Sequence, residues 1–192
     1  MRFELLFDDL AAQLDARLAA DGAHEHAEEE RLRAARTTLR ERLESLVDDA
    51  PIRVRLADGS VIDVVPSAVG CDWVAGGLAS GAEAIVPLAS IASVALDTAQ
   101  LRTSRERMPR PRPGGALATK LGIGVLLRDL ARRRVPLDVV SLSESAPLHG
   151  TVDRVGADHL DLAVHERGTA RREGSVLEHR LIALAAVVML RV

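Results

Sequence analysis

The feature that most constrains this chain is a motif that occurs twice. Residues Gly150–Val164 read GTVDRVGADHLDLAV, and Val65–Leu78 read VPSAVGCDWVAGGL. Both contain Val-Gly-x-Asp, at Val69–Asp72 and again at Val155–Asp158. An internal repeat limits the possible folds more than local propensities do, because both copies must adopt a related structure. We therefore predict a duplicated fold.

The segments that flank the two motifs also resemble each other. Apolar and polar residues alternate in Ile52–Leu56 before the first motif, and Leu137–Leu142 stands before the second. The apolar segments Ile85–Leu96 and Leu181–Val192 follow them. A period of two is typical of strands with one buried face. Each copy thus predicts five short strands, and closure into a barrel would remove the exposed edges of so small a sheet.

The spacing of the motif resembles that of a known family. The second copy fits the pattern G-x-V-x-x-V-G-x-D-x-L at Gly150, Val152, Val155, Gly156, Asp158 and Leu160. The first copy matches at Asp58-Gly59, Val69, Gly70, Asp72 and Val74, with Val64 in the place of Gly150. With a helix before each strand set, the chain resembles a tandem of Sm-like or SH3-like small β-barrels. The uridine-binding loop residues of that family have no clear match here, so the resemblance implies no site.

We accordingly predict an α+β, mainly β protein with two five-stranded small barrels. A helix precedes each barrel, and a long helical region extends from the N-terminus. The predicted domains are an acidic helical or coiled-coil region at 1–49, the first barrel at 50–98, an Arg/Pro-rich linker and helix at 99–134, and the second barrel at 135–192.

The N-terminal region has two amphipathic stretches, Phe3–Ala20 and Glu25–Val47. An isolated helix of this kind needs a partner for its apolar stripe. The partner is a second copy of the chain, the other half of a hairpin, or the chain's own barrel, and we favour self-association through residues 1–49. Trp73 is expected to point away from its barrel and to be covered by a neighbouring element. The interface candidates are Leu6, Leu10, Leu14, Leu32, Leu39, Leu46 and Trp73.

Composition narrows the class of protein. Aromatic residues make up 2% of the chain, so the cores must be built from Val, Leu, Ile and Ala. A single cysteine, Cys71, rules out an intrachain disulfide. The acidic residues Glu4, Asp8 and Asp9 argue against a signal peptide, and Leu181–Leu190 is about half the length of a membrane span. These features predict a cytoplasmic protein that does not enter a membrane.

No motif in the sequence indicates catalysis. The glycines of Gly76–Gly81 lack the lysine and the helix of a phosphate-binding loop, and there is no Gly-x-Ser-x-Gly. His24 and His26 are two residues apart, a spacing that does not place them on one helix face to bind a metal. Asp72 and Asp158 each follow Val-Gly, where a carboxylate commonly caps its own turn. We therefore expect a non-enzymatic protein without cofactor or metal.

Three histidines of the second copy, His149, His159 and His165, fall at strand positions. Their convergence in a site is one interpretation. The sequence favours the other, in which they are solvated or hydrogen-bonded within the fold.

The clearest functional signal is charge. The chain carries a net charge of −3, yet residues 99–134 contain ten basic side chains and two acidic ones. These basic residues are Arg102, Arg105, Arg107, Arg110, Arg112, Lys120, Arg128, Arg132, Arg133 and Arg134. Such a segment can neutralise phosphates or bind an acidic protein surface. The barrels lack aromatic residues for base stacking. We predict a self-associating binding or scaffold protein, and the alternative is an RNA- or DNA-binding regulator that uses residues 102–134.

Overall fold

The computed structural model describes residues 13, 28–106, 117 and 119–192. The chain divides into two compact units, residues 1–38 and residues 39–192. Within the first unit, residues 28–36 are helical. The predicted helix Glu25–Val47 is not continuous, because Thr37 and Thr38 interrupt it. The Arg33 carbonyl accepts both the Thr37 backbone N–H at 3.0 Å and the Thr37 hydroxyl at 2.8 Å at the end of this helix.

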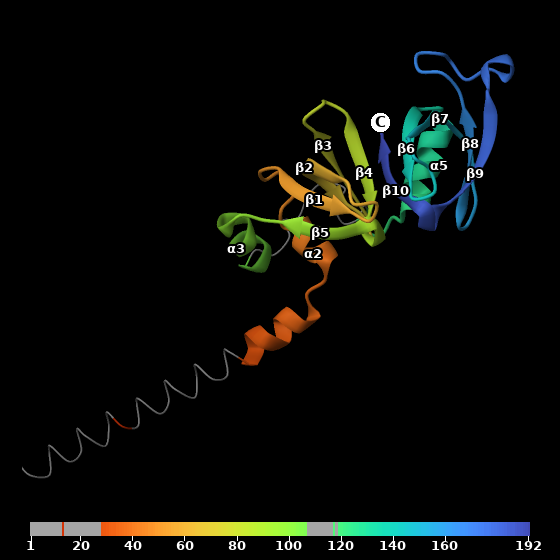
Figure 1. The fold of residues 1–192 in the computed structure, drawn as a ribbon. Helices are drawn as coiled ribbons and strands as arrows, with labels where there is room; N and C mark the ends of the chain where they lie inside the picture. The colour runs from red at the N-terminus through yellow and green to blue at the C-terminus, as the bar shows by residue number, and fades with distance from the viewer. Residues whose placement is uncertain (1–12, 14–27, 107–116, 118) are drawn as a thin grey trace, which may run out of the picture. The chain divides into compact units, whose positions relative to one another are not determined.

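The second unit contains two sets of five strands (Figure 1). The first set comprises β1 (Ile52–Leu56), β2 (Val61–Val69), β3 (Trp73–Leu78), β4 (Glu83–Pro87) and β5 (Ile91–Ala95). The second set comprises β6 (Pro136–Ser141), β7 (Leu148–Val155), β8 (His159–Val164), β9 (Glu178–Ala183) and β10 (Val187–Arg191). Among the described residues of this unit, the α-helices are α2 (Leu39–Glu44), α3 (Thr98–Glu106) and α5 (Ile123–Arg133). Three short 3-10 turns are η1 (Leu88–Ser90), η2 (Glu173–Ser175) and η3 (Leu184–Ala186).

The strand order confirms a mainly β fold made of two similar halves. The first set runs β5-β1-β2-β3-β4 and the second runs β10-β6-β7-β8-β9, all antiparallel. The predicted separate closure of each set is not what the hydrogen bonds show. Strand β4 pairs with β10, so all ten strands form one open sheet with β5 and β9 at its edges. Each set covers an edge of the other, and that pairing takes the place of closure at β4 and β10.

The register of the two sets matches residue by residue. In the first set Val64 pairs with Leu78, and in the second Gly150 pairs with Val164. Each β2–β3 or β7–β8 ladder then shifts by one residue at the same place, after Pro66 and after Val152. The two Val-Gly-x-Asp turns also form the same backbone bonds, each 2.8 Å long: Gly70 to Trp73, Gly156 to His159, Leu88 to Asp72 and Leu184 to Asp158. The sequence repeat therefore extends to individual hydrogen bonds.

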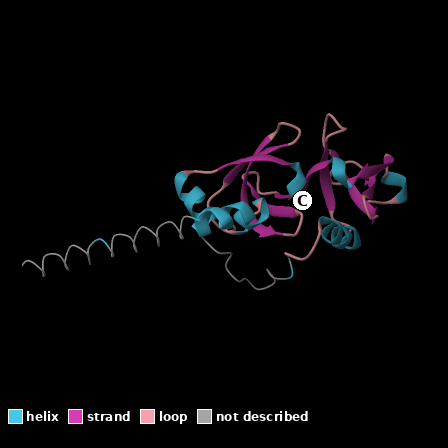
Figure 2. Cartoon of the chain, turned by 90° about the horizontal axis from the view of Figure 1, so that it is seen from below, coloured by secondary structure: helices cyan, strands magenta, loops and turns pink. Residues whose placement is uncertain are grey.

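Each set has its own aliphatic core, as the scarcity of aromatic residues requires. The first is built around Ile52, Val54, Leu56, Val64, Val69 and Val74, with Leu43 and Leu46 from the segment that begins at α2. The second is built around Leu137, Val139, Val152, Leu160 and Leu162, with Ile123 and Leu127 from α5. Helices α2 and α5 occupy equivalent places, against β2 and β7. Figures 1 and 2 show α5 beside the second set and α3 beside the first.

The helix ends carry a second sign of duplication. Asp48 and Arg134 are the only non-glycine residues with positive φ in the described part of the chain, at 59° and 53°. Each lies between a helix and the first strand of a set. Neither residue is the Gly or Asn that commonly adopts this conformation after a helix, so the positive φ could not be predicted from the sequence.

Helix α3 is fixed to the first set by polar contacts. Asp97 and Gln100 exchange hydrogen bonds as a capping box at its start. The Gln100 amide also donates to the Pro51 carbonyl at 3.0 Å, and Ser104 accepts from Arg42 at 2.7 Å. None of the helices in the described ranges has the length and hydropathy needed to cross a bilayer.

The two motif glycines allow a matched test of the turns. A Cβ at Gly70 would overlap the Trp73 ring, and one at Gly156 would overlap the His159 ring. Trp73 is buried and bonded, whereas the side chain of His159 is 41% exposed and has room to move. We expect Gly70→Ala to lower the free energy of unfolding by about 1–3 kcal/mol, and Gly156→Ala by roughly half of that or less. Urea unfolding of both variants measures the difference; equal losses would contradict it.

Candidate functional site

The two strand sets meet at the pairing of β4 with β10. Leu190 lies opposite Ile85, and Arg191 lies opposite Ala84. Glu83 and Val192 exchange backbone hydrogen bonds of 3.0 and 2.9 Å just beyond them. Ile85 is 5% exposed and Leu190 is fully buried. We call this contact, from Glu83–Pro87 to Val187–Val192, the joint.

The first Val-Gly-x-Asp turn strengthens the joint. The Trp73 indole N–H donates to the Leu121 carbonyl at 3.0 Å, and the ring packs in the core of the second set. The Asp72 carboxylate accepts a 2.8 Å bond from the backbone N–H of Ile123, the first residue of α5. The Asp72 carboxylate, which we expected to cap its own turn, therefore caps a helix of the other half.

In the second set, the strand equivalent to β4 is β9, and no strand of the described structure pairs with its outer edge. The strand registers equate Leu181 with Ile85 and Val94 with Leu190. Leu181 is 73% exposed, in contrast to the buried Ile85. Asp158, the counterpart of Asp72, is largely exposed and bonds to the ring of its neighbour His159 at 2.8 Å. That hydrogen bond holds the pKa of Asp158 below its ordinary value.

The predicted N-terminal interface residues have different positions in the structure. Leu46 is fully buried beside Leu43 in the first core, so it does not face a partner. Leu32 and Leu39 are exposed. The other three leucines, Leu6, Leu10 and Leu14, lie outside the described residues.

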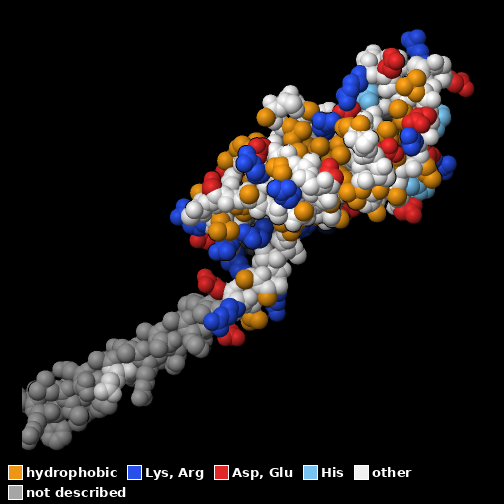
Figure 3. All heavy atoms as spheres, viewed as in Figure 1, with side chains coloured by type: hydrophobic (Ala, Val, Ile, Leu, Met, Phe, Trp, Pro, Cys, Tyr) orange, Lys and Arg blue, Asp and Glu red, His pale blue; other side chains and the backbone are white. Residues whose placement is uncertain are grey.

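The predicted basic surface is not brought together in the described structure. Arg102 and Arg105 are exposed on α3 beside the first set, and Lys120 precedes α5. Arg132 and Arg133 both pair with Asp129 on their own helix, and Arg128 donates to the Gly156 carbonyl. Arg134 follows α5, while Arg107, Arg110 and Arg112 lie outside the described residues. On the face seen in Figure 3, basic side chains are spread over several elements.

Both sets have a hollow at the same position, beside the pairing of their first two strands. In the first set Arg53 pairs with Asp63 across β1 and β2 at 2.9 Å, and in the second Asp138 pairs with His149 across β6 and β7 at 2.8 Å. The first hollow, of about 900 Å³, is lined largely by small and apolar side chains such as Val65, Leu78, Ala79, Ala95 and Leu96. The second, of about 460 Å³, is lined by Arg134, His149, Thr151, His165, Thr169 and Arg171. We call the second one the His149 hollow.

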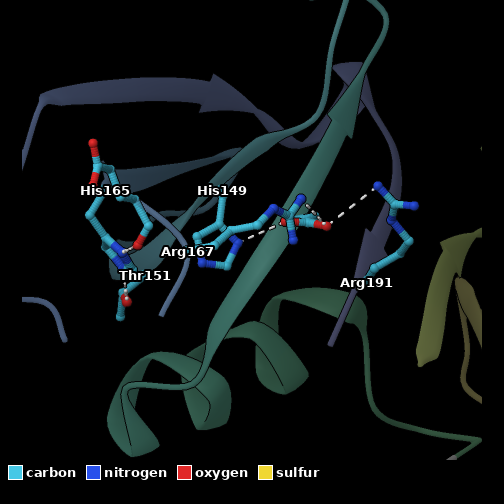
Figure 4. A network of polar contacts seen from close by, with 7 residues as sticks. His149, Thr151, His165, Arg167 and Arg191 are labelled. Carbon is cyan, nitrogen blue, oxygen red and sulfur yellow. Dashed lines mark hydrogen bonds and ion pairs between the residues drawn. The ribbon is translucent and has the colours of Figure 1, made fainter. Parts of the chain in front are cut away.

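The Asp138 carboxylate holds His149, one of the residues that line the hollow, and two arginines; Figure 4 labels these three partners, His149, Arg167 and Arg191. Asp138 accepts 2.8 Å bonds from His149 Nδ1 and from Arg167, and Arg191 lies at 3.4 Å. Burial raises the pKa of Asp138, but the hydrogen bonds from Arg167 and His149 outweigh that effect and hold the pKa below its ordinary value. The carboxylate is therefore charged at neutral pH, and it fixes the hydrogen of His149 on Nδ1.

Thr151 and His165 form a second polar pair at the hollow. His165 Nδ1 is 3.1 Å from the Glu166 carbonyl, which only accepts, so Nδ1 carries the hydrogen. His165 Nε2 then accepts from the Thr151 hydroxyl at 2.9 Å. Both residues are 2% exposed, and the His165 ring stands edge-on to that of His149 at 5.3 Å. The rings of His149 and His165 thus lie together, while each makes its hydrogen bonds with other residues of the fold, and His159 bonds to Asp158.

Sequence reasoning did not single out Asp138, Thr151, Arg167 or Arg191. The available signal was the repeat itself, because a position-by-position alignment sets Thr151 against Val65 and His165 against Ala79. Across the described residues, no three potential metal ligands converge, and His24 and His26 are not among those residues.

Comparisons of this chain with protein families, with curated proteins and with solved structures find no match. The functional argument therefore depends on the geometry described above.

The depressed pKa of Asp138 predicts a pH-dependent contribution to stability. A carboxylate whose pKa is lower in the folded state stabilises the protein above its unfolded pKa of about 3.9, and loses this effect as the pH falls through the folded value. We expect Asp138→Asn to reduce stability most at neutral pH, with the deficit shrinking below about pH 4. Urea unfolding of the wild type and the variant at a series of pH values from 7 to below 4 measures this difference in stability. Asp161→Asn is the control, and a deficit that grows as the pH falls would contradict the prediction.

Proposed function

We propose that the protein is a non-enzymatic, self-associating scaffold or binding protein whose copies join end to end through the edges of the sheet. The observation that carries this proposal is the joint between β4 and β10, because the equivalent strands β9 and β5 are each paired on one side only in the described structure. We further propose that each strand set, with its own core, acts as a small-barrel module of the Sm-like or SH3-like kind.

The joint is a head-to-tail contact. It uses one edge of the first set and the opposite edge of the second, and such contacts repeat into rings or filaments when the molecule carries both surfaces. Edge β9 corresponds to β4, and edge β5 corresponds to β10. The same register between two molecules would place Leu181 opposite Val94 of the next copy, and Arg180 opposite its Ala95.

The free edges have the properties that such pairing requires. Strand β9 ends the sheet with an exposed leucine at the position where the joint buries Ile85. Covering a leucine side chain contributes about 1.5–3 kcal/mol, and the strand also gains main-chain hydrogen bonds. Monomeric proteins usually protect such an edge with a charge, a proline or a covering segment. Strand β5 (IASVA) carries neither a charge nor a proline, whereas β9 carries Glu178 and Arg180, which pair with each other.

Residues 1–38 offer a second route to association. They form a compact unit distinct from the sheet, and Leu32 is exposed on their helical segment. We propose that this unit brings copies together and that the sheet edges then fix their order.

The edge can be tested by removing one N–H group. Leu184 donates to Asp158, and alternation along an antiparallel pair turns the N–H of Leu181 away from β8. Leu181→Pro removes that donor and no ladder bond, so an edge strand should tolerate it. We expect the wild-type mass to rise with concentration in sedimentation velocity, and Leu181→Pro to reduce this association at least about tenfold.

Leu181→Ala is the matched control, since it shortens the side chain and keeps the N–H. We expect it to weaken association less than the proline variant does. A wild-type chain that stays at 20.6 kDa at every concentration would overturn the proposal. Equal association of wild type and Leu181→Pro would exclude the β9 edge.

A truncation separates the two routes. It should end at Thr38, because Leu43 and Leu46 belong to the first core and their removal would unfold the sheet. We expect the chain lacking residues 1–38 to stay folded by circular dichroism and to associate more weakly than the full chain. Combining the truncation with Leu181→Pro should give a monomer by light scattering. A combined variant that still associates would show that another surface is used.

A further inference from the structure

The His149 hollow has diverged from its counterpart in a way that indicates a polar ligand. Where the first set has Val65 and Ala79, the second has Thr151 and His165, almost fully buried and bonded to each other. Burying a polar pair costs desolvation energy that an apolar pair does not, and a single hydrogen bond offsets only part of it. The fold itself does not need this pair, because the first set holds the same register without it.

The charge around the hollow is positive. Arg134 comes from the end of α5 and Arg171 from the loop before η2, and both line the hollow. Close behind them, Arg167, Arg191 and His149 share the single carboxylate of Asp138, while Asp153 pairs with Arg171. Four arginines thus stand against two aspartates and Glu173, whose charge also acts on Arg171.

The buried Nε atoms of Arg171 and Arg191 have no acceptor within the described structure. Buried donors of this kind are uncommon in native proteins and call for an explanation. Arg171 lines the hollow together with Arg134, whose side chain is exposed and has no partner in the described structure. An anion held between these two residues would satisfy the Nε of Arg171 and pair with the guanidinium of Arg134.

We propose that the His149 hollow binds a small molecule through its phosphate monoester group. The phosphoryl oxygens would lie between the guanidinium groups of Arg134 and Arg171, a geometry that suits arginine. Nε2 of His149 completes the site. The Asp138 carboxylate holds the other ring nitrogen, Nδ1, at 2.8 Å and so fixes the orientation of the ring.

The size of the hollow supports a small ligand. Its volume of about 460 Å³ lies within the range of small-molecule sites, which is roughly 300–1,000 Å³. The residues from Gly168 to Arg171 form one wall. A terminal phosphate can enter such a space alone, whereas a phosphate inside a nucleic-acid chain must bring both of its neighbours.

Calorimetric titration of the full chain with inorganic phosphate and with ribose 5-phosphate tests the proposal. We expect one saturable site for each, with tighter binding of the sugar phosphate. Ring-nitrogen NMR signals of His149 should shift on binding, and those of His159, which is bonded to Asp158, should not. An RNA oligonucleotide with a free 5′-hydroxyl should not compete, because it has no monoester. Competition by that RNA, or the absence of saturable binding, would overturn the proposal.

Substitutions in the hollow test which residues bind the phosphate group. Arg134→Gln and Arg171→Gln should each weaken binding by about tenfold or more, because each removes a charge-assisted contact. Arg154→Gln removes an exposed arginine that does not line the hollow, and we expect no change. Thr151→Val restores the residue type of the first set, and should weaken binding while the chain remains folded. If the arginine variants bind phosphate as tightly as Arg154→Gln does, the assignment is wrong.

Discussion

The structure of residues 39–192 depends on one interaction, the main-chain pairing of β4 with β10. This pairing turns two five-strand sets into one sheet, and it exchanges residues between their cores. Ile85 and Trp73 pack in the second core, while Val188 and Met189 pack in the first. The Asp72 carboxylate at the start of α5 adds a polar contact to the same joint. Neither set can therefore keep its full core in the absence of the other.

Much of this arrangement follows from the sequence, for definite reasons. The paired Val-Gly-x-Asp motifs and alternating apolar residues predict ten short strands in two equal sets, and the structure has them in the same order. Short strands can be predicted from the sequence because one face is buried and the other is not, which makes apolar and polar residues alternate. The pairing of β4 with β10 does not follow, because edges of similar composition do not reveal which partner they meet. Nor does the break at Thr37 and Thr38, because the leucine spacing of the predicted helix continues past it.

The candidate site was less visible in the sequence. His149 and His165 can each be noticed in the sequence as histidines at strand positions. Their partners Asp138 and Thr151 cannot, because a polar residue is common in an alternating strand pattern. The His149 hollow emerges only when the two halves are compared at equal register, because Arg53 with Asp63 and Asp138 with His149 then occupy one position. A duplicated fold provides its own reference: positions that both halves keep serve packing, and positions that differ are free to acquire other chemistry. The Arg-rich segment shows the opposite case, since its described residues are adjacent in the sequence and divided in space.

The joint also has a consequence for how chains exchange parts. Because both of its strands belong to one polypeptide, the connecting residues hold them at an effective concentration on the order of millimolar. Two molecules at lower concentration keep their own joints closed. If the joint opens in crowded or concentrated protein, β10 of one chain meets β4 of another with the same register, and the second sets change places. The connecting residues thus favour the joint within one molecule, and they also permit domain swapping, because the swapped joint uses the same contacts.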